Sequence, residues 1–228
     1  MEIKFLISFI IGILNIFLGI VIYNKNRQSL NNIFYGLMCF AGGMWSIFMS
    51  FLWVVKDISF IRSFIIPATY MFAIPVPLFY LLFAYNFPLK SFIYPKSLLR
   101  LAVIFPTIFV ILVITGILRI ENAKFIEEDI FYTEVIFDIF LIFTIYFFGY
   151  VIWGLSILLQ KFKKDIFATY KKPIIYLIIG TITTFCLTGI VSIIVPLLHS
   201  SKYDWLGPVF TSSHFIVVGY FIFFETRK

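Results

Sequence analysis

Long apolar stretches follow one another along almost the whole chain, separated by short segments that hold most of the charged residues. A helix needs about 20 mostly apolar residues to cross a bilayer. The stretches are continuous rather than alternating, which favours membrane-spanning helices over the strands of a β-barrel. The pattern predicts seven such helices, at residues 5–23, 33–55, 64–87, 101–118, 136–159, 174–198 and 205–224.

The composition also indicates a membrane protein. Of the 228 residues, 62% are hydrophobic and 13% are charged, whereas roughly 25% are charged in soluble proteins. The first stretch is too long for a signal-peptide core and has no small-residue cleavage pattern after it, so it is interpreted as a retained helix. Cys39 and Cys186 lie inside apolar stretches and are interpreted as packing residues. The sequence predicts one all-α domain, a polytopic seven-helix bundle covering residues 1–228.

Basic residues orient the bundle, since Lys and Arg in short loops stay on the cytoplasmic side. With the N-terminus outside and the C-terminus in the cytoplasm, twelve of the 18 basic residues are cytoplasmic. These twelve are Lys25, Arg27, Lys90, Lys96, Arg100, Lys161, Lys163, Lys164, Lys171, Lys172, Arg227 and Lys228. The net charge of +7 is therefore spread over loops and gives no continuous basic face for nucleic acid.

The longest outer connection reads RIENAKFIEEDIFYTEV, from Arg119 to Val135, and carries several acidic residues among short alternating patches. Such a pattern predicts a small hairpin or an interfacial cap between the fourth and fifth helices.

Polar residues inside apolar helices are costly unless they face other helices, so they are the candidates for function. No Asp, Glu, Lys or Arg lies near a predicted helix midpoint. The main polar residues are Asn15, Ser46, Ser50, Thr181, Thr183, Thr184, Thr188, Ser192, Thr211, Ser212, Ser213 and His214. Two rows repeat at i+4, Gly42–Ser46–Ser50 and Gly180–Thr184–Thr188–Ser192. Each row is either a helix-packing seam or a line of ligand contacts.

His214 is the main candidate for a sensing pocket, because an imidazole about nine residues into a helix needs a partner. It shares a helix face with Thr211, and the two could meet the threonine row of the sixth helix. The alternative is a structural histidine bonded to a neighbouring helix. Three further residues at outer helix ends, Asp138, His199 and Asp204, are either hydrated end residues or a shared polar mouth.

Prolines 67, 75 and 77 all fall in the third helix, where they remove backbone donors. They predict a kink or local opening around AIPVPL. Such a kink is either one wall of a pocket or a fixed bend without a ligand.

Enzymatic chemistry is not expected from this sequence. It contains no HExxH motif, no Cys and His cluster for a metal, no Gly-rich phosphate loop and no buried pair of carboxylates. A retinal pigment is disfavoured because the last helix has no Lys for a Schiff base. No cofactor or metal is predicted.

The chain resembles the N-terminal seven-helix sensor region of bacterial histidine kinases and of some cyclic-dinucleotide signalling proteins. The resemblance rests on Trp45 in AGGMWSIFMS, on a proline-bearing third helix that ends in LLFAYNFP, and on the final DWLGPVFTSSHFIVVGYFIFFETRK. It implies a multi-pass sensor of the bacterial plasma membrane. The candidate ligand contacts are then His214, Thr211, Thr184, Thr188, Ser192, Trp45, Ser46 and Asn15.

Members of that family usually continue into a kinase or cyclase domain, whereas this sequence ends at Lys228. The expected partners are therefore the lipid bilayer, a small or lipophilic ligand, and a separate kinase or other cytoplasmic output protein; a truncated reading frame is the other explanation. Two other classes stay open. A small transporter or channel subunit would line a path with Asn15, the threonines and His214, and a purely structural partner would have a dry interior.

The distribution of basic residues predicts the outcome of a labelling experiment. A cysteine introduced at Glu128 should react with a membrane-impermeant reagent in whole cells, because its loop is predicted to be outside. A cysteine at Lys164 should stay unlabelled. The reverse pattern would contradict the predicted orientation.

Overall fold

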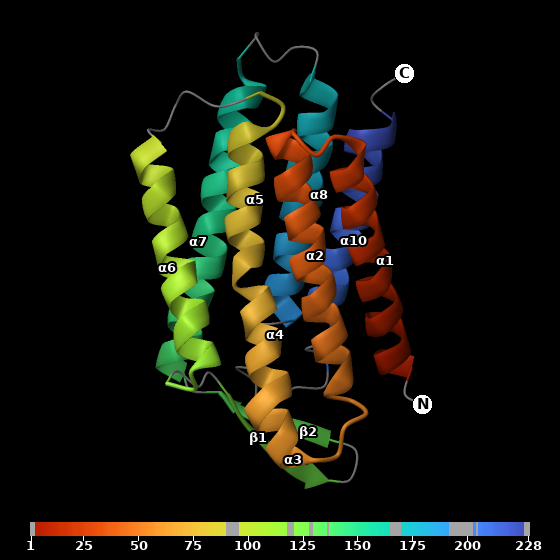
Figure 1. The fold of residues 1–228 in the computed structure, drawn as a ribbon, viewed down its shortest axis with the longest axis vertical. Helices are drawn as coiled ribbons and strands as arrows, with labels where there is room; N and C mark the ends of the chain where they lie inside the picture. Colours follow the sequence, from red (N-terminus) through yellow and green to blue (C-terminus); the bar gives the residue numbers. More distant parts are fainter. Residues whose placement is uncertain are drawn as a thin grey trace.

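The computed structural model describes residues 3–89, 96–117, 121–127, 130–135, 137–164, 170–191, 203 and 205–225. These residues form an elongated bundle of helices with a two-stranded hairpin at one end (Figure 1). The N-terminus lies at the hairpin end and the C-terminus lies at the opposite end. The helices are α1 (Ile3–Lys25), α2 (Leu30–Phe51), α3 (Ile58–Phe60), α4 (Ile66–Ala73), α5 (Pro75–Asn86), α6 (Lys96–Ile114), α7 (Phe137–Phe162), α8 (Lys171–Gly189) and α10 (Leu206–Tyr220).

Two π-helical turns complete these elements. The turn η1 (Ile61–Ile65) joins α3 to α4, and η4 (Phe221–Glu225) continues α10. Because α3, η1, α4 and α5 follow one another as a single column, the described residues pass through the bundle seven times (Figure 1). Six passes are long and apolar enough to span a membrane, and the apolar part of α6, Arg100–Ile114, is shorter.

All seven predicted helices are present, although several begin earlier and end earlier than predicted. The helix predicted at 33–55 is α2, and the helix predicted at 101–118 is α6. The helix predicted at 174–198 begins at Lys171, and residues 192–198 lie outside the described part of the chain. Hydropathy predicts only the part of a helix that lies in the lipid core, whereas the helix itself can continue into the polar interface. Polar first turns were therefore missed.

The outer connection between α6 and α7 contains the predicted hairpin. Strand β1 (Glu121–Glu127) pairs antiparallel with β2 (Ile130–Val135), so that Glu121 lies opposite Val135. This hairpin is the exception to the all-α prediction, and its tip, which includes Glu128, lies outside the described residues.

The predicted interruption of the third pass occurs at Ile74, between α4 and α5. Pro75 and Pro77 cannot donate backbone hydrogen bonds, so the carbonyls one turn earlier lose their usual partners. The Tyr146 hydroxyl of α7 donates to the Ile74 carbonyl at this position. This bond ties α7 to the interruption, but the carbonyls that the prolines leave without a helical donor are those of Met71 and Ala73, four positions before each proline.

Glycines bring α1 and α2 into direct backbone contact. A methyl carbon added at Gly43 would lie 2.6 Å from the Gly12 carbonyl oxygen, and one added at Gly19 would lie 2.9 Å from that of Gly36. Small residues promote membrane helix packing because they allow this approach. The predicted row Gly42–Ser46–Ser50 is therefore only part of the packing surface of α2, and the closest contact with α1 is made by Gly36 and Gly43.

The interior of the bundle is centred on α2 and α5. Helix α2 contacts α1, α4, α5 and α10, while α5 contacts α7 and α6, and α8 contacts α7 and α10. The largest hydrophobic cluster joins α1, α2, α4, α5, α7, α8 and α10 and includes Tyr35, Phe83 and Phe215. Large apolar side chains of α1 and α6, such as Leu14 and Ile108, are about half exposed, which suits contact with lipid tails.

Lys161 holds the cytoplasmic ends of α5 and α7 together. Its Nζ lies 2.9 Å from the carbonyl oxygen of Ala84, 2.7 Å from that of Tyr85, 2.6 Å from that of Phe87 and 2.9 Å from that of Leu89, so its three N–H donors are shared among four acceptors. Carbonyls at a helix C-terminus lack partners within the helix and attract cations. The predicted loop cation is thus a fully buried structural residue, at 0% exposure.

The α1–α2 contact predicts that Gly43→Ala destabilises the protein. The added methyl would overlap the Gly12 carbonyl oxygen, so the helices must separate, at a cost of about 1–3 kcal/mol. Thermal unfolding in lipid nanodiscs should shift down by several degrees. Gly149→Ala is the matched control, because a methyl there meets nothing within 4 Å. Equal melting temperatures for the two variants would contradict the close contact.

The Lys161 contacts predict that Lys161→Met is destabilising by at least about 2 kcal/mol, because three buried carbonyls and one partly buried carbonyl lose a charged donor. Lys164→Met changes an exposed lysine one turn further along and should leave the melting temperature unchanged. If both variants melt at the wild-type temperature, Lys161 does not fasten α5 to α7.

Candidate functional site

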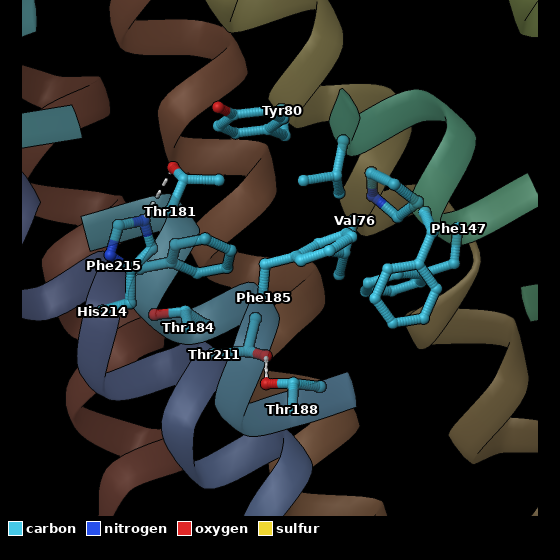
Figure 2. A pocket seen from close by; sticks show the side chains of 13 residues that line it. Val76, Tyr80, Phe147, Thr181, Thr184, Phe185, Thr188, Thr211, His214 and Phe215 are labelled. Atoms are coloured by element: carbon cyan, nitrogen blue, oxygen red, sulfur yellow. Dashed lines mark hydrogen bonds between the residues drawn. The ribbon is translucent and has the colours of Figure 1, made fainter. Parts of the chain in front are cut away.

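A cavity lies at the middle of the bundle between α5, α7, α8 and α10 (Figure 2). The space in it open to water-sized molecules is about 40 Å³, enough for a few waters by the measure that one water needs about 10–15 Å³. The lining residues are Val76, Pro77, Tyr80, Phe147, Phe148, Val151, Thr181, Thr184, Phe185, Thr188, Thr211, His214 and Phe215. The kinked start of α5 is therefore one wall of this cavity.

His214 faces inward from α10 and is 9% exposed. Its Nε2 lies 3.4 Å from the Thr181 hydroxyl of α8 (Figure 2). Gly180 makes room for the ring, since a methyl carbon added there would lie 2.6 Å from the imidazole Cε1. The imidazole is thus held against the α8 backbone while its edge contributes to the cavity wall.

A second polar contact joins the same two helices one turn nearer the start of α10. The Thr188 and Thr211 hydroxyls lie 3.4 Å apart (Figure 2). Thr211 also donates to the Gly207 carbonyl of its own helix at 3.0 Å. These hydroxyls therefore have partners without any ligand, and they help to fasten α8 to α10.

The other side of α10 is bonded to α2. The Ser212 hydroxyl donates to the Gly42 carbonyl at 3.2 Å, and the Tyr35 hydroxyl donates to the Phe215 carbonyl at 2.7 Å. The run from Thr211 to His214 is polar in an apolar helix because its side chains reach helices on both sides. Helix α10 is consequently held between α2 and α8.

The apolar wall of the cavity is aromatic. Phe148 of α7 and Phe185 of α8 meet edge to face, with ring centroids 4.4 Å apart. Both rings are half-buried, as is Phe147. The outward side of this pair is therefore within reach of lipid, while its inward side lines the cavity.

Tyr80 also lines the cavity, although it is not among the polar candidates that the sequence suggests. Its side chain is 3% exposed and lies against α7, where a methyl added at Gly154 would be 2.6 Å from its Cε1. The hydroxyl points toward Thr181, its polar neighbour (Figure 2), but no described residue lies at the distance and angle of a formed hydrogen bond to it. Its i, i+4 spacing from Val76, which places both side chains on one face of α5 directly after the prolines, is a signal that could have identified it.

Four of the eight predicted ligand contacts line the cavity together, namely Thr184, Thr188, Thr211 and His214. Asn15, Trp45 and Ser46 do not line it. Ser46 donates to the Ser8 carbonyl of α1 at 2.8 Å, Trp45 packs edge to face on Phe147 from α2, and the Asn15 amide is fully buried beside Gly42.

Three predicted residues, Ser192, His199 and Asp204, lie outside the described residues. Asp138 is in the first turn of α7, and its side chain is not among those described. The predicted shared polar mouth therefore stays a prediction. Within the described ranges, no three His, Cys, Asp or Glu side chains come together as metal ligands.

The sequence was compared with family models and with curated proteins. The family model for the N-terminal 7TM region of histidine kinase matches residues 7–226. A comparison with curated proteins found no match. The match covers nearly the whole chain and agrees with the seven passes of the fold. The chain therefore belongs to the family of N-terminal 7TM regions of histidine kinases and is a multi-pass protein of the plasma membrane.

Proposed function

We propose that this sensor region responds to a small lipophilic molecule in the cavity between α5, α7, α8 and α10, and that α10 carries the response toward a cytoplasmic output protein or domain. One observation carries the proposal. The cavity is lined by Thr211, His214 and Phe215, which belong to the last helix before the cytoplasmic end of the chain. A molecule in the cavity would thus contact the element best placed to transmit its presence.

The far end of α10 has its own connections. Lys25 of α1 donates to the Phe223 carbonyl in η4, and its ammonium lies 4.1 Å from the centre of the Phe224 ring. Tyr35 of α2 packs edge to face on Phe223 at 5.0 Å. A displacement of α10 at the cavity would be opposed or relayed by these contacts at the cytoplasmic end.

A small transporter or channel subunit is the competing function. Such proteins often place charged residues at the membrane midplane and have broken helices at corresponding positions of two internal repeats. The residues lining this cavity include no Asp, Glu, Lys or Arg. The chain also shows no internal repeat of the kind common in transporters. These features and the family membership favour sensing.

Filling the cavity should change output. In a fusion of the full chain to the transmitter of a characterised histidine kinase, Thr184→Phe should change autophosphorylation in membranes by at least about fivefold, the lower end of usual allosteric coupling. Thr183→Phe is the matched control, because Thr183 is the neighbouring residue and is exposed, whereas Thr184 lines the cavity. His214→Phe, which keeps a ring but removes Nε2, should also change output.

Equal autophosphorylation in wild type, Thr184→Phe and Thr183→Phe would contradict the sensing role of the cavity. Melting temperatures measured on the same membranes identify any variant that has lost its fold. A variant that retains output but blocks uptake of a solute in proteoliposomes would favour the transporter.

A further inference from the structure

The surface of the cavity is almost wholly apolar, and the buried Tyr80 hydroxyl lies at one end of it, which together point to a class of ligand. We propose that it binds a neutral, membrane-soluble molecule that presents one hydrogen-bond-accepting oxygen to the Tyr80 hydroxyl. This inference rests on the proposed sensing function, because it names what that same site would recognise.

Tyr80 supplies the central observation. Its phenol is 3% exposed, and among the described residues no group lies at the distance and angle of a formed hydrogen bond to its hydroxyl, although Thr181 is close by. A buried donor left unpaired costs about 1–3 kcal/mol, so it gains from any acceptor that enters the cavity. The close approach of its ring to Gly154 fixes where the hydroxyl points. The hydroxyl is therefore a donor at a defined position beside the cavity.

Other polar groups lie beside that donor. The hydroxyl points toward Thr181, whose own hydroxyl is only 3.4 Å from His214 Nε2, at the weak end of hydrogen bonding (Figure 2). A carbonyl or ether oxygen could accept from Tyr80 and also from Thr181. By contrast, Thr188 and Thr211 already bond each other and Gly207. The acceptor is thus expected at the Tyr80 end.

The rest of the lining excludes charge. Val76, Val151, Phe147, Phe148, Phe185 and Phe215 surround the remaining space. None of the lining residues is Lys, Arg, Asp or Glu, and the imidazole of His214 is the one lining group that can take up a positive charge, so an ionised ligand would be buried without a permanent counter-charge, at a high cost. A ketone, ester, ether or alcohol with an apolar body matches these walls.

The ligand would enter from the bilayer. Phe148 and Phe185 both line the cavity and are half-buried, so their outer side is within reach of lipid. They close the space between α7 and α8 through an edge-to-face contact of side chains, at a centroid distance of 4.4 Å. Rotation of either ring would enlarge the space for a body larger than a few waters.

The test compares two probes of nearly equal shape, cyclohexanone and methylenecyclohexane, which differ in replacing C=O by C=CH₂. Saturable binding to the full chain in nanodiscs of deuterated lipid is measured by saturation-transfer NMR, with empty nanodiscs as the partition blank. Wild type should bind cyclohexanone about fivefold more tightly, the effect of one hydrogen bond. Tyr80→Phe should bind the two probes equally.

The matched control is Tyr220→Phe, which makes the same change at a residue that is 58% exposed, and it should retain the preference. Tyr80→Phe should melt no lower than wild type, because it removes an unpaired hydroxyl. Absence of any preference in wild type overturns the proposal whether or not the variant folds. Failure of both probes to bind, with the cavity holding water only, also overturns it. So does a Tyr80→Phe variant that still prefers cyclohexanone over methylenecyclohexane.

The two proposals can fail separately. If cyclohexanone binds through Tyr80 while Thr184→Phe leaves kinase output unchanged, the ligand class is right and the sensing role is wrong. If Thr184→Phe changes output but no preference depends on Tyr80, the cavity senses something without this acceptor.

Discussion

The structure depends on the absence of water from the hydrocarbon core, which obliges polar groups there to find partners within the protein. The bundle meets this demand mainly by directing side-chain donors at backbone carbonyls of other helices. Ser46, Tyr35, Ser212, Tyr146 and Lys161 all do so. A carbonyl accepts a second hydrogen bond without leaving its own helix, so each contact joins two passes while both helices stay intact. The polar residues thus mainly form hydrogen bonds that hold neighbouring helices together. Those without such a bond are the candidates for ligand contacts.

Much of the architecture could be predicted because lipid imposes a simple rule on sequence. Seven apolar stretches gave seven passes, and the acidic outer connection gave a hairpin. Helix ends were less accurate, because Lys171 and the polar start of α2 are helical outside the apolar zone. The role of Lys161 was hidden for a related reason. Its place beside a loop suggested a topology signal, while its partners lie more than 70 positions earlier in the chain.

The candidate site could be predicted only in part. The i, i+3 spacing of Thr211 and His214 and the i+4 row of α8 identified two facing surfaces, which the fold brings together. Asn15, Trp45 and Ser46 are equally buried but lie elsewhere in the bundle. Depth along a helix can be estimated from sequence, whereas the direction in which a face points requires knowledge of its neighbours. Tyr80 was missed because an aromatic ring in an apolar helix resembles ordinary core.

The glycine contact between α1 and α2 has a mechanical consequence. Where two backbones touch, as at Gly12 and Gly43, there is no side chain whose torsion angles can absorb a displacement. Across the bundle, α7 and α8 meet through the rings of Phe148 and Phe185, which can adopt other rotamers at modest cost. The molecule therefore has a stiff side and a compliant side. Helix α10 lies between them, contacting α1 and α2 on one side and α8 on the other. A displacement of α10 is therefore expected on its α8 side, while its contacts with α1 and α2 stay in place.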